Sequence, residues 1–382
     1  MLQKNQFSGI CKALTTALCK YIIKDMKEID FSELARPNIN ALKPYETKEI
    51  PCKVKLDANE SPYCIDIIPD KKILKRLNRY PDPDSKELKK TISKALKIKK
   101  NNILLGNGSD ELIYYLITTF GGPVLYPVPT FSMYGIIAQA LGEKNIGIPL
   151  DKDFDIDEER MLAAIKKYRP KLIFFSSPNN PTGNGFSADK ILRIIDSSFV
   201  IRHPSLVIVD EAYQPFSSKK GFLPLLRDYK NLAILRTLSK IGFAALRVGF
   251  LIADKDLINE VNKVRLPFNL NALSQSMALE AFKNKNIIEA QIKNIASERE
   301  RLFYELSRIN NVWPYPSEAN FILFRTKNAN EVYKGLIKQD VLVRNMGSAA
   351  KDSLRVTIGT PKENELFLKA LIKAVGGKNE KG

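Results

Sequence analysis

The sequence predicts an α/β protein, with a mostly parallel mixed sheet in a large domain and a smaller α+β domain. Three apolar runs, KLIFFSSPN (171–179), SLVIV (205–209) and NLAILRTLS (231–239), are typical of buried strands and are spaced for helical crossovers. From about residue 272 this alternation gives way to a long helical stretch and then to short strands. A chain of 382 residues is also longer than one hydrophobic core usually supports, which favours two domains.

The residues before the three runs contribute further elements. Segment VKLDANESPY (54–63) contains a short strand and a turn, and residues 84–99 form a predicted helix that Ser85 can cap. NILLGNGSDELIYYLITTF (102–120) combines a strand, a glycine-containing turn and an apolar helix. PVLYPVPTF (123–131) is predicted to be another strand, so the sheet already begins on the N-terminal side of the three runs.

The residues after the three runs complete both domains. VGFLIAD (248–254) is a further predicted strand, for which an antiparallel position stays open. A helical stretch over 272–310 leads to strand-like runs and to helices near 330–338 and from 362. We therefore predict an N-terminal extension, a segment associated with the small domain, a large domain and a small C-terminal domain, at residues 1–30, 31–55, 56–270 and 271–382.

The composition is that of an ordinary globular chain, with 44% apolar residues, 27% charged residues and a formal net charge of +18. The lysines are scattered in short groups without an interleaved aromatic platform, so no nucleic-acid partner is expected. No run reaches the roughly 18 to 20 apolar residues of a membrane helix, so no membrane partner is expected either. Residues 9–22 have helical apolar spacing interrupted by lysines, which favours a short amphipathic helix or a poorly ordered extension over a secretory signal. A cytoplasmic location is the resulting expectation.

Metal sites and histidine-based catalysis are not expected. The four cysteines, at positions 11, 19, 52 and 64, form no C-x-x-C pair. His203 is the only histidine in the chain, which excludes multi-histidine metal sites. It precedes Pro204 in a predicted loop, so a histidine-based triad is not expected either.

Three side chains of different chemistry accompany the three apolar runs. Asn180, Asp210 and Lys240 are each 30 residues apart. Because the carboxyl ends of parallel strands meet at one edge of a sheet, we expect these side chains to lie where open α/β sheets bind ligands. A lysine that can form a Schiff base and a carboxylate that can face a pyridine nitrogen are what pyridoxal 5′-phosphate (PLP) requires. The spacing therefore predicts a PLP site, although each residue alone is more often a solvated or capping side chain.

Motifs at the same edge supply candidate partners for such a cofactor. GNGSDELI (106–113) precedes a helix whose free amides attract phosphate, although a serine-capped turn also explains it. SPNNPTG (177–183) makes Asn180 a candidate for contact with a ring oxygen, although turn chemistry alone accounts for such stretches. In VDEAY (209–213), Tyr213 can hydrogen-bond the phenolic oxygen of the cofactor.

The most specific stretch is RTLSKIGFAALRVG (236–249). Ser239 and Arg247 flank Lys240 within one loop, and both are phosphate-binding residue types. A lysine with a hydroxyl and a guanidinium close by in sequence therefore indicates attachment of a phosphorylated cofactor.

Taken together, these motifs resemble those of fold-type I PLP-dependent enzymes of the aminotransferase class I/II family. Within it, GNGSDE, SPNNPTG, DEAY, RTLSK, LRVG and LRVTIGT are most similar to the histidinol-phosphate aminotransferases, from about residue 30 to about 372. One spacing departs from the pattern. The family usually has eight residues from the Schiff-base lysine to the phosphate-binding arginine, whereas Lys240 and Arg247 are seven apart.

The resemblance implies roles on the cofactor side. Lys240 would carry the cofactor and shuttle the proton, with Asp210 and Tyr213 as its catalytic partners. The remaining cofactor-binding residues would be Ser109, Asp110, Phe131, Asn180, Ser239, Arg247 and Tyr80. The resemblance implies that Phe131 would stack on the cofactor ring. It also implies that Tyr80 would reach the phosphate of the cofactor bound in the partner subunit. A homodimer with shared active sites is the corresponding expectation.

The resemblance also implies a reaction and a substrate pocket. The substrate side would consist of Tyr45, Asn59, Asn180, Arg344 and Arg355. The expected substrates are small molecules, a phosphorylated amino alcohol and 2-oxoglutarate, converted by transamination in histidine biosynthesis. An aromatic amino acid aminotransferase, a threonine-phosphate decarboxylase of cobalamin synthesis and a binding protein with a relic site stay open as alternatives.

Overall fold

The structure is a computed structural model of the 382-residue chain that describes residues 30–44, 50–200 and 204–376. The chain forms two compact units, residues 1–45 and 46–382. In the first unit, the described residues form two short helices, α2 (Phe31–Leu34) and α3 (Pro37–Asn40). The second unit contains two sheets. No helix within the described ranges is both long enough and apolar enough to cross a membrane.

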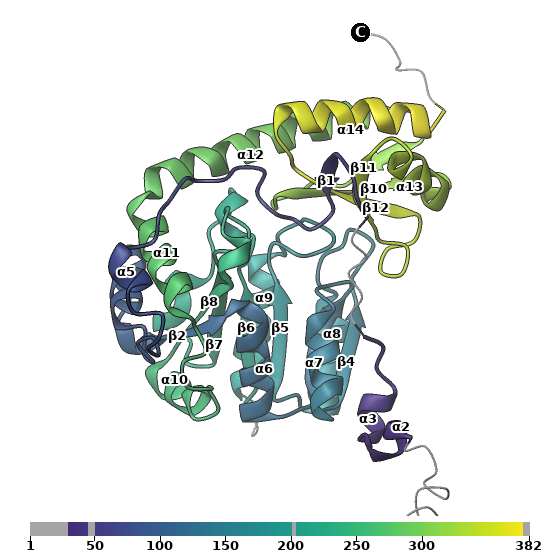
Figure 1. Cartoon of the computed structure of the whole chain (residues 1–382). Coiled ribbons are helices and arrows are strands. Elements are labelled where there is room, and N and C mark those ends of the chain that lie inside the picture. Colours follow the sequence, from purple (N-terminus) through teal and green to yellow (C-terminus); the bar gives the residue numbers. More distant parts are fainter. Residues whose placement is uncertain (1–29, 45–49, 201–203, 377–382) are drawn as a thin grey trace, which may run out of the picture. The chain divides into compact units, whose positions relative to one another are not determined.

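The larger sheet has seven strands in the order β2-β8-β7-β6-β5-β3-β4. Only β8 is antiparallel, and it lies between β2 and β7 (Figure 1). This arrangement confirms the predicted α/β fold and the antiparallel option for residues 248–254. The strands are β2 (Ile103–Asn107), β3 (Val124–Val128), β4 (Asn145–Pro149), β5 (Leu172–Ser176), β6 (Leu206–Asp210), β7 (Leu232–Thr237) and β8 (Val248–Ala253).

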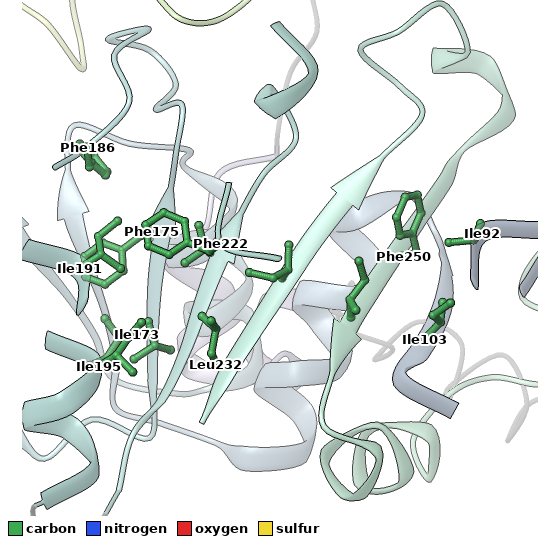
Figure 2. Close-up of a cluster of buried hydrophobic side chains, with 14 of the residues drawn as sticks. Ile92, Ile103, Ile173, Phe175, Phe186, Ile191, Ile195, Phe222, Leu232 and Phe250 are labelled. Carbon is green, nitrogen blue, oxygen red and sulfur yellow. The ribbon is translucent and has the colours of Figure 1, made fainter. Parts of the chain in front are cut away.

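Helices cover both faces of this sheet, because its strands are apolar on both sides. In β5, Ile173 and Phe175 point to one core layer, whereas Leu172 and Phe174 point to the other. Figure 2 shows part of the first layer, with Phe175 next to Ile191 and Ile173 next to Ile195 of a covering helix. The first layer contains α5 (Lys86–Leu96), α8 (Glu158–Tyr168), α9 (Ala188–Val200) and α11 (Ala272–Lys283). The second contains α6 (Gly108–Phe120), α7 (Met133–Leu141) and α10 (Lys255–Asn262).

The smaller sheet has five strands in the order β1-β11-β12-β10-β9, with β1 parallel to β11 and the other pairs antiparallel. The strands are β1 (Val54–Leu56), β9 (Val312–Pro314), β10 (Phe321–Thr326), β11 (Val341–Asn345) and β12 (Ser353–Thr357). One face packs on three helices, of which α12 and α14 run above the sheet in Figure 1. These helices are α12 (Lys285–Ser307), α13 (Ala329–Ile337) and α14 (Pro361–Ala374).

Residues alternate between the two faces of each small-sheet strand. Ile322, Val343 and Val356 belong to the core under the helices. Their neighbours on the opposite face are Phe321, Arg344, Arg355 and Thr357. We call this second face the site face, because it carries residues that contact the larger sheet's carboxyl edge.

Some details differ from the sequence-based expectations. Ser85 does not cap α5 with its side chain; Asp82 instead accepts from the Lys86 amide at 2.8 Å. The predicted helix over 272–310 is two helices, α11 and α12, separated at Asn284. The connection from β6 to β7 contains two short 3₁₀ helices rather than a crossover α-helix, at Gln214–Phe216 and Leu223–Arg227.

The predicted domain boundaries stay predictions. β1, which overlaps the C-terminal end of the predicted segment 31–55, pairs with β11 of the small sheet. On the other side, Ala281 of α11 belongs to the core of the large sheet, whereas Leu302 of α12 belongs to the core of the small sheet. The changeover between the two cores therefore occurs along α12.

Candidate active site

The three side chains singled out by their spacing lie at the carboxyl ends of three adjacent parallel strands. Asp210 is the last residue of β6, while Asn180 and Lys240 lie in the loops after β5 and β7. The Lys240 Nζ lies 5.7 Å from the centre of the Tyr213 ring. Asn180 Oδ1 accepts a hydrogen bond from Arg355 of the site face at 2.5 Å. The predicted meeting of these residues at one sheet edge is what the structure shows.

Asp210 is buried, with 3% of its surface exposed, and both carboxylate oxygens have donors. Tyr134 Oη donates to Oδ2 at 2.9 Å, and the Ala212 amide donates to Oδ1 at 3.1 Å. Burial raises the pKa of Asp210 to about 6, because the charged form loses hydration, and the two hydrogen bonds oppose this shift. A buried carboxylate of this kind is set up to face a cationic group that replaces the lost hydration.

Tyr134 was not identified from the sequence, although it lies only three residues after Phe131. It is fully buried in α7, and Asp210 is on the same face of β6 as α7 because residues 206 and 208 also point there. Burial and the neighbouring carboxylate raise the pKa of Tyr134, so its hydroxyl stays a donor. The Phe131 ring, which is half-buried, packs edge-on against Tyr134 with centres 5.6 Å apart.

The N-terminus of α6 forms a cradle of donors next to the lysine loop. α6 begins at Gly108 directly after β2, and Asn107 provides no side-chain cap to its first-turn amides. Arg247 Nη1 lies 3.4 Å from Ser239 Oγ, and its Nη2 lies 3.3 Å from Asp110 Oδ2. Free amides at a helix N-terminus, a hydroxyl and a guanidinium together form an anion-binding group.

Two glycines keep this cradle open. Gly108 has a φ of +80°, and a Cβ on it would collide with the Arg247 side chain. A Cβ on Gly249 of β8 would come within 2.5 Å of the Ser109 backbone nitrogen. The Gly108 amide also donates to the Arg247 carbonyl at 2.8 Å. The loop between Lys240 and Arg247, one residue shorter than the family pattern, therefore still delivers the guanidinium to α6.

A buried ion pair, also missed from the sequence, supports the ends of β6 and β7. Glu211 is 1% exposed, and its Oε2 accepts from Arg236 Nε at 2.9 Å and from Nη2 at 2.7 Å. Its Oε1 accepts from the Phe222 amide at 2.5 Å. The pair links the residue after Asp210 to the strand that leads to Lys240. The only signal in the sequence was the second acid of the DEAY motif.

The site face brings two arginines together. Arg344 of β11 and Arg355 of β12 are direct cross-strand partners in an antiparallel pair, so their side chains start from the same face. Arg355 is 7% exposed and donates to the Asp57 carbonyl at 2.8 Å, in addition to its bond to Asn180. Arg344 is half-buried, and no hydrogen bond or ion pair of its side chain is found within the described parts of the chain. Directly opposed like charges are destabilising unless an anion is present, so the pair indicates an anion-binding position.

Other predicted residues have different outcomes. Asn59 is buried and donates to the hydroxyl of Tyr213 at 2.9 Å. Tyr80 is 81% exposed and stacks on Phe268 with ring centres 4.5 Å apart, on the surface. Tyr45 lies outside the described residues.

The residues present fit PLP. A buried carboxylate suits the pyridine nitrogen, the α6 cradle suits the phosphate, and Lys240 lies between them along the same sheet edge. The two glycines leave the approach to the α6 amides free of side chains. The fold and the site together define a PLP-dependent enzyme built on a mostly parallel α/β sheet.

Comparison with known proteins identifies the family. The family model described as aminotransferase class I and II matches residues 43–371. A histidinol-phosphate aminotransferase of Aquifex aeolicus (strain VF5) is 43% identical over 349 residues, covering 88% of this chain and 97% of that relative. This chain belongs to the aminotransferase class I and II family, and its cofactor is PLP.

Solved structures agree with this assignment. The crystal structure of the histidinol-phosphate aminotransferase from Clostridium acetobutylicum matches with a TM-score of 0.77 at 27% identity, covering 85% of this chain and 99% of that one. The L-threonine-O-3-phosphate decarboxylase from Porphyromonas gingivalis matches with a TM-score of 0.71 at 24% identity, covering 84% of this chain and 98% of that one. The second likeness concerns the fold alone, and it shows that the fold does not separate transferases from lyases.

Proposed function

We propose that this chain is a histidinol-phosphate aminotransferase, which transfers the amino group of histidinol phosphate to 2-oxoglutarate in histidine biosynthesis. The products would be imidazole acetol phosphate and glutamate. The observation that carries the choice of substrate is the opposed pair Arg344 and Arg355 on the site face. The sequence identity to relatives of that name, 43% in the Aquifex aeolicus protein, supports the same choice.

Histidinol phosphate has no carboxylate, so its phosphate must occupy the cationic end of the pocket. A phosphate dianion between two guanidinium groups relieves their mutual repulsion and accepts charge-assisted hydrogen bonds from both. A single carboxylate carries half that charge and needs fewer donors. Two adjacent arginines therefore favour the phosphorylated donor, while Arg355 also serves the carboxylate of 2-oxoglutarate.

The roles of the other residues follow from their positions. When bound, PLP supplies an electron-withdrawing ring that stabilises the charge left at the substrate carbon after proton loss. The Asp210 carboxylate holds the proton on the pyridine nitrogen, and Tyr134 and the Ala212 amide orient that carboxylate. The α6 amides with Ser239 and Arg247 would bind the phosphate, and Tyr213 and Asn180 would contact the phenolic oxygen. Lys240 Nζ would hold the cofactor covalently in the resting enzyme. Once displaced by the amino group of the donor, it would act as the base that removes the proton from the substrate carbon and as the acid that returns it.

A donor panel tests the proposal. Purified enzyme is given histidinol phosphate, unphosphorylated histidinol, phenylalanine, tyrosine or threonine phosphate, and both keto product and released CO₂ are measured. We expect the highest kcat/KM with histidinol phosphate and about a ten- to hundredfold preference over histidinol, from one or two charge-assisted hydrogen bonds. A higher kcat/KM with phenylalanine would assign the chain to the aromatic aminotransferases instead. Release of CO₂ from threonine phosphate would assign it to the decarboxylases.

We also propose a homodimer with shared active sites, located in the cytoplasm. Tyr80 and Phe268 stack on the surface, and the segments that carry them contain further exposed apolar side chains, as is typical of an interface. The other exposed large apolar side chains near these two residues in sequence are Ile68, Leu74, Leu77, Leu266 and Leu273. Tyr80 would reach the partner's cofactor phosphate from this position, and Tyr45 would reach the partner's substrate.

Subunit mixing tests the shared sites. Lys240→Ala and Tyr80→Ala chains are each expected to be inactive. After verified subunit exchange, activity should partly return, because one site of each heterodimer has both residues intact. Unchanged inactivity of the exchanged mixture would contradict shared sites, and a monomer in analytical ultracentrifugation would contradict the dimer.

A further inference from the structure

We propose that Asn59 is a positioning residue that fixes the direction of the Tyr213 hydroxyl. Asn59 Nδ2 donates to Tyr213 Oη at 2.9 Å, and both side chains are buried, with 1% and 4% exposed. The two residues come from different parts of the unit: Asn59 follows β1 of the small sheet, whereas Tyr213 follows β6 of the large sheet. This role differs from the substrate contact expected for Asn59.

Three hydrogen bonds hold Asn59 in place. Its backbone amide donates to Thr357 Oγ1 at 2.9 Å, and its carbonyl accepts from Asn320 Nδ2 at 3.0 Å. Its side-chain Oδ1 accepts from the Thr357 hydroxyl at 3.3 Å. Arg355 also binds the carbonyl of Asp57 just before it. The loop that carries Asn59 is therefore tied to β12 at two points.

The hydrogen bonds of Thr357 show which end of the Asn59 amide faces Tyr213. The Thr357 oxygen accepts from the Asn59 backbone, and its single proton is donated to Asn59 Oδ1. The Nδ2 group is then the end that faces the Tyr213 oxygen. The bond between Asn59 and Tyr213 consequently runs from amide to hydroxyl, and the tyrosine keeps its own proton to donate elsewhere.

The direction of this bond matters for the cofactor. A tyrosine hydroxyl that accepts a hydrogen bond becomes a better donor, because the two bonds polarise each other. In the proposed function, on which this inference rests, the proton of Tyr213 goes to the phenolic oxygen of PLP. That hydrogen bond favours the form in which the phenolic oxygen is negatively charged. Asn59 thus lowers the pH at which the bound cofactor loses its proton, although it does not touch the cofactor.

The backbone of Asn59 dictates the variants for a test. Its φ of +56° lies in the left-handed region, which glycine, asparagine and aspartate adopt more readily than other residues. Asn59→Gly removes the donor without backbone strain. Asn59→Asp keeps the shape but replaces the donor by a carboxylate, which would draw the Tyr213 proton toward itself. Asn311, exposed and also at positive φ (64°), provides matched controls as Asn311→Gly and Asn311→Asp.

The measurement is the pH titration of the visible absorption band of the purified holoenzyme without substrate. We expect Asn59→Gly to raise the apparent pKa of the band by about half a unit to one unit, the value of one hydrogen bond. Asn59→Asp should raise it at least as far as Tyr213→Phe does. The Asn311 variants should leave it unchanged, and thermal unfolding verifies that each variant is folded.

A double variant separates this role from general damage to the site. In a Tyr213→Phe background, Asn59→Gly should produce no further shift, because the hydroxyl through which it acts is absent. An equal shift in both backgrounds, or no shift in Asn59→Gly where Tyr213→Phe shifts the band, would overturn the inference while leaving the proposed function intact. A protein that binds PLP without any lysine-linked visible band would contradict the proposed function and this inference with it.

Discussion

The carboxyl edge of the large sheet and the site face of the small sheet differ in how their charged and polar side chains are paired. At the edge, buried polar groups have partners: Asp210 receives two hydrogen bonds, and Tyr213 receives one from Asn59. On the site face, Arg344 stands directly opposite Arg355, and two like charges share one position in the sheet. At the carboxyl edge, the buried Asp210 carboxylate has its hydrogen bonds and can still pair with a cation. On the site face, the two opposed guanidinium groups can be neutralised by a bound anion.

This difference corresponds to how long each ligand stays. A cofactor that remains bound through every turnover benefits from side chains already fixed in one geometry, because no ordering is needed at each cycle. A substrate phosphate or carboxylate must enter and leave, so its binding energy can come from relieving a repulsion that returns when it departs. We therefore expect substitutions at the carboxyl edge to change the rate of the chemical step, and substitutions on the site face to change the preference between substrates.

The largest expected effect is at Lys240. Lys240→Ala should lower kcat by about 10⁴-fold or more, because it removes both the covalent anchor and the group that moves the proton. Borohydride reduction of the wild-type holoenzyme followed by peptide mass spectrometry should locate the cofactor on Lys240. Lys220→Ala, at an exposed position, is the control and should retain normal turnover. An adduct on another lysine would mean that the carboxyl edge of the large sheet is not where the cofactor is attached.

The second effect concerns Asp210. Its replacement by asparagine should stabilise the cofactor-free protein but lower the turnover of the protein with PLP bound. Its pKa is raised from 3.8 to about 6 in the folded chain, so the unfolded chain loses this proton first as pH rises. Without cofactor, stability therefore falls between about pH 4 and pH 6, and Asp210→Asn should be more stable than wild type above pH 6 by about 2–3 kcal/mol.

The measurement is urea unfolding of both cofactor-free proteins between pH 4 and pH 8. The difference should become small near pH 4, where wild-type Asp210 is protonated in the folded state and roughly half protonated in the unfolded state. The same variant with PLP bound should lose most of its turnover, because an amide does not hold the pyridine proton. A pH-independent difference would mean that the carboxylate is not desolvated as described.

Next in size are the arginines of the site face. Arg355→Lys should lower kcat/KM about ten- to hundredfold for both histidinol phosphate and 2-oxoglutarate, since lysine cannot make a bidentate contact. Arg344→Lys should act mainly on the phosphorylated substrate. Arg325→Lys is the control, because Arg325 is exposed on neighbouring β10 and lies over Trp313. Equal losses of kcat/KM for both substrates in Arg344→Lys would mean that Arg344 does not act mainly on the phosphorylated substrate.

The smallest effect is expected from Tyr134. Tyr134→Phe removes one of the two donors to Asp210 and should lower kcat by about three- to tenfold with little change in KM. Tyr126→Phe is the matched control: its hydroxyl bonds Asn145 at 3.1 Å in the same core layer but does not contact Asp210. Comparable losses in both variants would indicate that only packing is disturbed.

Much of the large sheet and its site could be predicted from the sequence. The positions of Asp210 and of the turn before α6 can be recognised from the residues next to them in sequence. Parallel strands present their carboxyl ends to one edge of the sheet, so a residue that ends such a strand can be assigned to that edge. The equal spacing of 30 residues was informative even though the second connection has no α-helix. Lys240 could be placed there before any register was known.

The contacts that depend on register could not be predicted. That Arg344 faces Arg355, that Asn59 reaches Tyr213 and that Tyr134 reaches Asp210 follow from how strands and helices far apart in sequence are aligned. Ser85 illustrates the same limit on a smaller scale, because Asp82, three residues earlier, takes over the capping of α5. Side-chain types indicated which chemistry to expect, but only the fold determines the pairs.

The position of β8 has a consequence for how the protein acquires its cofactor site. β7 and β8 are neighbours in sequence, so their pairing around the lysine loop closes only a short stretch of chain. β2 joins β8 across most of the large domain, and it brings the α6 amides with it. Pairings between distant segments form slowly, because a long loop must first close. The loop that carries Lys240 can thus form early, with the pairing of β7 and β8. The α6 amides that would bind the phosphate reach the site only when β2 pairs with β8. Tight retention of PLP therefore marks a chain that has finished folding.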